Sequence, residues 1–183
     1  MKEKGVDGAE VGGFKVAVDG WHQIEVQEGI DLMKGKGGEG IYQDEKTGQH
    51  AWVFPLKVKD PDDESDGANI GFTVFEKGGG DTLATLLAAV GLWDALIKKF
   101  PGDDVTVFDK PVIEGIKVKL PGMSCMARSQ VDKQGYAKAA QFASFKRYKE
   151  IMAEEKAKGG GKSAAKAGAE PQKEAAADGG ADW

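Results

Sequence analysis

One long amphipathic segment, residues 81–100, stands out in a chain whose other apolar residues mostly alternate with polar ones. Its apolar side chains recur at steps of three and four, which places them on one face of a helix. Asp81 suits the first turn, and Pro101 with Gly102 ends the segment. Gly91 is unfavourable inside a helix. The sequence therefore predicts either one helix or two short helices that meet at a bend. The apolar face consists of Leu83, Leu86, Val90, Trp93, Ile97 and Phe100.

The flanking segments predict short strands, because their apolar and polar residues alternate. In the clearest strand, residues 52–59, Lys57 and Lys59 lie on the face opposite to the apolar residues. Pro55 removes a backbone donor and predicts an edge or a bulge. Residues 116–120 repeat the pattern and predict a strand with Lys117 and Lys119 pointing outward. Further strands are expected at 14–18, 21–26, 70–74, 105–107 and 126–131.

The two ends of the chain differ from this middle part. Residues 1–13 are rich in charge and glycine and predict a flexible N-terminus. A C-terminal helix is expected from about Phe142 to Lys158, because helix formers are frequent from Ala137 onward. Residues 159–183 have too few apolar side chains to fold, which predicts a disordered acidic tail. The expected domain therefore covers 14–149, with the helix ending over 150–158, and is mainly β with one inserted helix.

Composition limits the environment of the protein. The chain has 183 residues, of which 40% are hydrophobic, and a net charge of −5. No apolar run approaches the roughly 18 residues of a membrane span, and residues 1–13 are too polar for a secretory signal. The single cysteine, Cys125, rules out an internal disulfide. We expect a cytoplasmic protein without a membrane partner.

The sequence contains no complete motif for catalysis or for a cofactor. Residues 35–40 match the glycine spacing of a dinucleotide-binding loop, but charged residues follow where a helix would be required, so a flexible loop is the better interpretation. His22 and His50 are isolated from other metal-ligating residues. Cys125 lacks a neighbouring base. The sequence predicts a protein that is not an enzyme and that has no metal or cofactor. A nuclease would need a clustered acidic or histidine site, which the sequence lacks.

Charge is distributed unevenly along the chain. Residues 110–149 contain nine basic and two acidic side chains, a net charge of +7 within an acidic protein. Residues 167–183 contain four acidic side chains and one lysine, a net charge of −3. A basic block followed by an acidic tail suggests an anionic polymer as ligand.

Aromatic residues add to this signal, because bases stack on aromatic rings while Lys and Arg bind phosphates. Any one ring could instead close an edge of the core, and the combination of rings with basic side chains favours binding. The side chains expected to bind phosphate are Lys57, Lys59, Lys117, Lys119, Arg128, Lys133, Lys146 and Arg147. The expected stacking residues are Trp21, Tyr136 and Phe142.

The chain resembles the single-stranded DNA-binding proteins of tailed bacteriophages. The likeness is in the strand AWVFPLKVK, the helix at 81–100, the segment VIEGIKVKL and the terminus DGGADW, and it covers about residues 14–148 plus the end. Members of that family commonly end in Phe after several consecutive acids, whereas this chain ends in Trp183. The resemblance implies an OB-like five-stranded barrel. It also implies sequence-tolerant binding of single-stranded DNA in replication or recombination, in the cytoplasm of the host cell.

The tail predicts a second function. Asp178, Asp182 and Trp183 have the form of a short peptide ligand for a replication or recombination protein. The alternative to DNA binding is therefore a phage accessory protein that recruits a partner through its tail. A solubilising tail with an incidental tryptophan is the simpler explanation. A homo-oligomer is compatible with the sequence.

Overall fold

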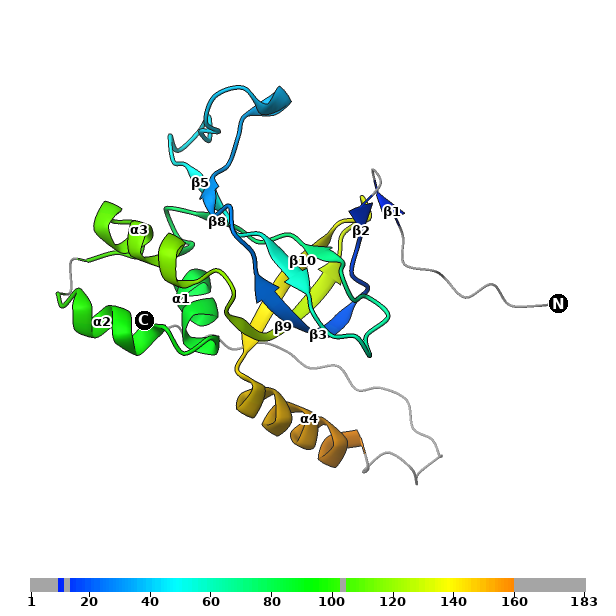
Figure 1. Cartoon of the computed structure of the whole chain (residues 1–183). Helices are drawn as coiled ribbons and strands as arrows, with labels where there is room; N and C mark the ends of the chain where they lie inside the picture. The colour runs from blue at the N-terminus through cyan, green and yellow to red at the C-terminus, as the bar shows by residue number, and fades with distance from the viewer. Residues whose placement is uncertain (1–9, 12–13, 103–104, 160–183) are drawn as a thin grey trace, which may run out of the picture.

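The computed structural model describes residues 10–11, 14–102 and 105–159. Most of the N-terminal stretch and nearly all of the tail, for which the sequence predicts disorder, lie outside these residues. The described chain forms a curled antiparallel sheet, with three helices gathered at one side and a fourth projecting away (Figure 1).

The curled sheet has five strands in the order β10-β9-β3-β6-β7, and each pairs antiparallel with its neighbour. Ile24 and Val26 on β3 point into the core, and both are fully buried. The turn at residues 132–135 joins β9 and β10 into a hairpin. The strands are β3 (Gly20–Val26), β6 (Leu56–Val58), β7 (Asn69–Ile70), β9 (Ser124–Val131) and β10 (Ala137–Ala143).

The two edges of this sheet meet at Gly71, just beyond β7. The N–H of Gly71 donates to the carbonyl of Ala137 at 2.8 Å, and the N–H of Ala139 donates to the carbonyl of Gly71 at 2.9 Å. A Cβ atom at position 71 would lie 3.3 Å from the Ala137 oxygen, so glycine suits this close approach. The contact is parallel and curls the five strands toward a barrel. The mainly β, OB-like fold predicted from the sequence is confirmed.

A smaller sheet continues from the barrel through a break at Phe54 and Pro55. The strand predicted over 52–59 is therefore two strands, β5 in the small sheet and β6 in the barrel. Residues 31–53 form an arm that projects from the barrel (Figure 1). A third, two-stranded sheet pairs β1 (Glu10–Val11) with β2 (Phe14–Lys15). The small sheet has the order β4 (Asp31–Leu32), β5 (Ala51–Val53), β8 (Thr73–Phe75), and the arm also carries η1 (Lys36–Gly38).

The amphipathic segment forms two helices, α1 (Gly80–Ala89) and α2 (Trp93–Lys99), which are bent by 114° relative to each other. Gly91 lies between them with φ of +79°, a conformation that favours glycine, so the predicted bend is confirmed. Among the described residues, no single helix is long and apolar enough to cross a membrane. α1 and α2 have the length and composition of a span only as a bent pair.

The expectation of one inserted helix is wrong, because residues 110–119 form a third helix, α3 (Lys110–Lys119), and not a strand. Pro111 occupies the first turn, where its missing N–H is harmless. The buried residues Val112, Ile113, Ile116 and Leu120 follow helical spacing. Val118, which the strand prediction put in the core, is 76% exposed. The strand expected at 105–107 is also wrong, since residues 105–107 belong to a loop.

The C-terminal helix, α4 (Phe145–Gly159), begins later than predicted. Residues 137–143, which are rich in helix-forming alanine, pair instead with β9, because tertiary pairing overrides local propensity. Ser144 then caps the helix, since its hydroxyl oxygen accepts a hydrogen bond from the N–H of Arg147 at 3.2 Å.

A buried histidine ties the barrel to the acidic turn at residues 60–67. His22 on β3 is 4% exposed. Its Nε2 lies 2.8 Å from the carbonyl oxygen of Val18, and its Nδ1 lies 2.6 Å from Oδ2 of Asp63. Both ring nitrogens therefore face oxygen atoms that accept hydrogen bonds. Burial raises the pKa of Asp63, but its hydrogen bonds with His22 and the N–H of Ser65 outweigh this and hold the pKa below the ordinary value of 3.8.

Replacing Asp63 with alanine should therefore lower the free energy of unfolding at neutral pH by about 1–3 kcal/mol, because the His22 ring loses its buried partner. Folding lowers the pKa of the Asp63 carboxyl group, so its contribution to stability is complete at pH values above the ordinary pKa. The contribution is lost as the pH falls through the pKa of the folded protein. Denaturant unfolding across a pH series measures both effects. The matched control is Asp62→Ala, an exposed neighbour in the same turn. Equal stability of the two variants at pH 7 would contradict this role.

Candidate nucleic-acid interface

The outer side of β7 and β8 is a strip of mostly small residues. From position 69 to 75, exposed and buried side chains alternate without interruption. The buried set consists of Ile70, Phe72 and Val74, whose alternation is also visible in the sequence. The outward set is Asn69, Gly71, Thr73 and Phe75. A strip with short side chains lets a ligand approach the backbone closely.

An aromatic pair lies at the arm end of this strip. Phe75 is 38% exposed. Its ring centroid lies 6.4 Å from that of Tyr42 in the arm, with the rings edge to face at 72°. Packing of this kind fixes the orientation of the exposed ring.

A second aromatic ring lies at the hairpin end. Tyr136 is 51% exposed and precedes Ala137, the residue that accepts the hydrogen bond from Gly71. Lys138 pairs directly with Gly71 across the junction. Its ammonium group also lies 2.8 Å from a carboxylate oxygen of Asp132. The hydrogen bond with Lys138, aided by the backbone N–H of Tyr136, lowers the pKa of Asp132.

Lys57 on β6 completes this surface, because it is the cross-strand partner of Asn69 and so shares its face. Lys59, two residues after Lys57, also points outward. Lys133 is exposed in the hairpin turn beside Tyr136. We call this surface the barrel face; it comprises Lys57, Asn69, Gly71, Thr73, Phe75, Tyr136 and Lys138. It contains two of the predicted residues, Lys57 and Tyr136, and two more, Lys59 and Lys133, lie at its rim.

A second cluster gathers the predicted residues Trp21, Arg128 and Arg147. Trp21 on β3 is the cross-strand partner of Arg128 on β9, which in turn faces Gln141 on β10. The Trp21 ring packs on Tyr148 of α4, with centroids 5.6 Å apart and planes tilted by 56°. One guanidinium nitrogen of Arg147 lies 3.1 Å from Glu150 and 3.2 Å from Glu154, and these hydrogen bonds raise the pKa of Arg147.

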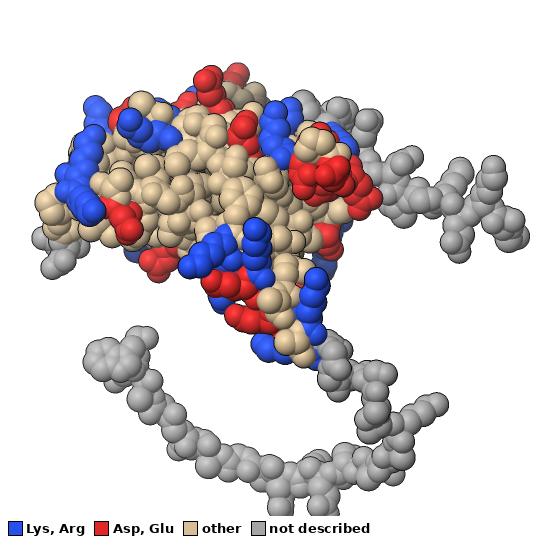
Figure 2. Space-filling view, turned by 60° about the horizontal axis from the view of Figure 1, so that its bottom comes forward, with Lys and Arg blue, Asp and Glu red and all other residues tan. Residues whose placement is uncertain are grey.

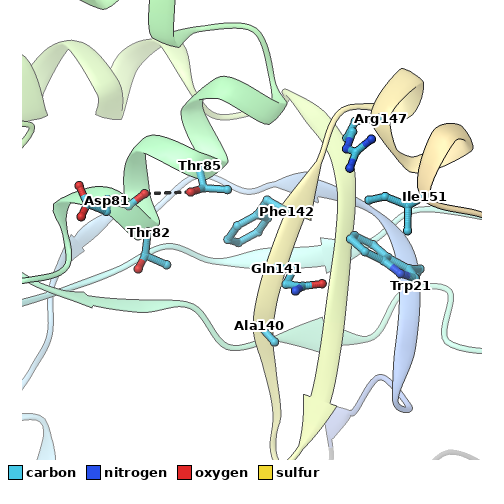
Figure 3. Close-up of a pocket in the computed structure, with 9 residues that line it drawn as sticks. All are labelled: Trp21, Asp81, Thr82, Thr85, Ala140, Gln141, Phe142, Arg147 and Ile151. Carbon is cyan, nitrogen blue, oxygen red and sulfur yellow. Dashed lines mark hydrogen bonds between the residues drawn. The ribbon is translucent and has the colours of Figure 1, made fainter. Parts of the chain in front are cut away.

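A groove of about 470 Å³ lies over β10 beside this cluster. One wall is formed by α1 and the other by Trp21 and α4 (Figure 3). Gln141 points toward the indole of Trp21 in this view. On the opposite wall the hydroxyl of Thr85 donates to the carbonyl of Asp81 at 2.9 Å. We call this the α1–α4 groove; Trp21, Thr82, Thr85, Gln141, Phe142 and Arg147 are among its lining residues.

Three predicted residues do not lie where the sequence suggested. Phe142 is only 8% exposed and packs edge to face on Phe72 at 4.8 Å, so it is a core residue and not a stacking platform. Lys117 and Lys119 lie on α3 and not on a strand. Lys117 pairs with Glu114 at 3.3 Å and lies 5.9 Å from the ring of Trp52, which is on the side of the small sheet opposite to Phe75.

The basic block of residues 110–149 is divided among α3, the β9–β10 hairpin and α4, so its nine basic residues do not share one face. Lys146 is exposed at the start of α4. Figure 2 shows Lys and Arg interspersed with Asp and Glu, most clearly along the projecting helix α4. The predicted tail residues Asp178, Asp182 and Trp183 lie outside the described residues.

The arrangement suits binding by stacking and by charge. Within the described ranges, no three His, Cys, Asp or Glu residues are grouped so that they could hold a metal ion. Cys125 is buried, and this burial raises the pKa of its thiol to about 12, so it does not supply a thiolate nucleophile at neutral pH.

Sequence reasoning missed Tyr42, Phe75, Lys138, Gln141 and Tyr148 as site residues. The sequence does contain a signal for Phe75. Because residues 70, 72 and 74 alternate as the apolar inner face, position 75 falls on the outer face. Lys138 belongs to the basic block of residues 110–149. Nothing local identified Tyr42, Gln141 or Tyr148, since their neighbours come from distant parts of the chain.

Comparison with protein-family models finds no match to this chain, and comparison with curated proteins finds no significant match.

Proposed function

We propose that this protein binds single-stranded DNA across the barrel face, with little dependence on sequence and without enzymatic activity. The observation that carries the proposal is the strip of short side chains on β7 and β8, which has an exposed aromatic ring at each end. A single strand laid along the strip would stack bases on Phe75 and Tyr136, and every base offers a face for such stacking.

The fold supports the same surface. OB-folds bind oligonucleotides on the face of their second and third strands and on the loops that join strands 1–2 and 4–5. In this chain the second and third strands correspond to β5–β6 and β7–β8. The 1–2 loop corresponds to the arm, which supplies Tyr42, and the 4–5 loop corresponds to the hairpin turn beside Tyr136.

Charge supports an anionic ligand on this face. Lys57 and Lys138 flank the strip from opposite sides, through their pairing with Asn69 and Gly71. Lys59 and Lys133 extend the basic rim. Because the sequence resembles the phage proteins, the proposal includes a role in phage DNA replication or recombination, in the host cytoplasm.

A second candidate function is protein interaction, and one observation favours it. Apolar side chains are exposed beside α2, where Ile97 is 50% and Val105 is 41% exposed. They line a groove of about 240 Å³ with Trp93 and Phe100. An accessory protein could bind a partner there or through its tail.

Binding of oligothymidine should weaken steeply between about 50 and 200 mM salt, because each phosphate contact contributes about −0.7 to the log–log slope. The double variant Lys57→Ala/Lys138→Ala should bind more weakly and have a shallower slope, by about 1.4 for two lost contacts. Fluorescence anisotropy across a salt series measures both quantities.

The matched control for these lysines is Lys117→Ala/Lys119→Ala, which removes the same charge from α3. It should leave the slope close to that of the unchanged protein. A slope near zero for the unchanged protein would exclude electrostatic DNA binding and favour the interaction function. Equal effects of the two double variants would exclude the barrel face as the site.

Tyr136→Ala and Phe75→Ala should each weaken oligothymidine binding by about 5- to 150-fold, the range that corresponds to the loss of one stacked base. Tyr136→Phe keeps the ring and should retain most of the affinity. Titration of each variant with oligothymidine at constant salt measures the affinity. Melting curves that show intact folding distinguish a loss of stacking from a loss of stability. Weakening by Tyr136→Phe as large as by Tyr136→Ala would argue against stacking.

A further inference from the structure

We infer that the α1–α4 groove forms a second segment of the DNA path and takes one unstacked nucleobase of the same strand against Trp21. The inference rests on the proposed function, because it extends the strand that lies on the barrel face.

Continuity between the two sites comes from β10. The first half of β10 borders the barrel face, where Lys138 pairs with Gly71. The second half forms the floor of the groove, where Ala140 and Gln141 line it. A bulge between Ala139 and Gln141 shifts the pairing with β9. Because a bulge re-aims the side chains around it, Ala140 and Gln141 are both exposed. A strand that follows β10 therefore passes from one site into the other.

The groove has the chemistry to hold a base. The Trp21 ring is half-buried and is fixed by Tyr148, which leaves an aromatic surface in a set orientation. Gln141 points toward that ring (Figure 3), and its amide offers both donors and an acceptor to the edge of a base. Thr82 adds a hydroxyl from the opposite wall. Unstacked bases are recognised by this combination of stacking and edge hydrogen bonds.

Charge around the groove orients the strand. Arg128 is exposed and lies next to Trp21 across the β3–β9 pairing, on the side where a phosphate would follow the stacked base. Arg147 stands at the rim, with its guanidinium held by Glu150 and Glu154. Asp81 lies on the far wall and adds negative charge there, with its carboxylate turned away from Gln141 and Trp21 (Figure 3). The sugar–phosphate backbone therefore runs on the Arg128 side.

The inference predicts a two-step dependence of affinity on oligonucleotide length. Short oligothymidines should occupy the barrel face alone, and longer ones should also reach the groove, within the range of about 4–16 nucleotides that OB-fold sites cover. In the full chain, Trp21→Ala should remove the additional affinity of the longer oligonucleotides, a loss of about 5- to 150-fold. It should leave the affinity for the shortest bound oligonucleotide unchanged. Gln141→Ala and Arg128→Ala, at exposed positions, should reduce the same gain without affecting folding.

Tryptophan fluorescence gives an independent readout. Long oligothymidines should quench part of the emission, and Trp21→Phe should remove that part, whereas Trp93→Phe on α2 should leave the quenching in place. The inference is overturned if the groove variants bind all lengths like the unchanged protein, or lose the same factor at every length. Absence of binding at any length would instead overturn the proposed function, and the inference with it.

Discussion

The hydrogen-bonded junction at Gly71 positions the candidate sites. Two backbone hydrogen bonds join this residue to Ala137 and Ala139 and hold the edges of the sheet together. The junction brings residues 136–138 against residues 69–75, although more than sixty positions separate them in the chain. A Cβ atom at position 71 would lie 3.3 Å from the Ala137 carbonyl oxygen, so a larger residue would require a small shift of that backbone. Stability and binding geometry therefore depend on one close approach of two backbones.

The strand β10 links this junction to the helices. Its first half closes the barrel, and its second half, beyond the bulge, lies between α1 and α4. Helix α1, which lies between β8 and β9 in the chain, covers the core with Leu83, Leu86 and Leu87 and also forms a wall of the groove. α4 contributes Tyr148, which fixes Trp21. Elements that stabilise the fold thus also shape the surface proposed to bind DNA.

The sequence predicted the parts of the fold that depend on local patterns. The alternation of residues 70–74 gave the inward face of β7 and β8, and Gly91 marked the bend between α1 and α2. The prediction for residues 116–120 was wrong because Ile116 and Leu120, four positions apart, also share one face of a helix, and Val118 lies off that face. Residues 137–143 have helix-forming alanines, and only their pairing with β9 makes them a strand. The groove and the barrel face combine residues that are distant in sequence, so no local pattern could assemble them.

The most direct test of the account is to map where a single strand touches the full-length protein. Ultraviolet cross-linking of oligothymidine, followed by mass spectrometry of the digested protein, reports the side chains that lie against bases. The account predicts cross-linked peptides that contain Phe75 and Tyr136, and their loss on competition with unlabelled oligothymidine. Cross-links confined to α2 or α3, with none on the barrel face, would contradict it.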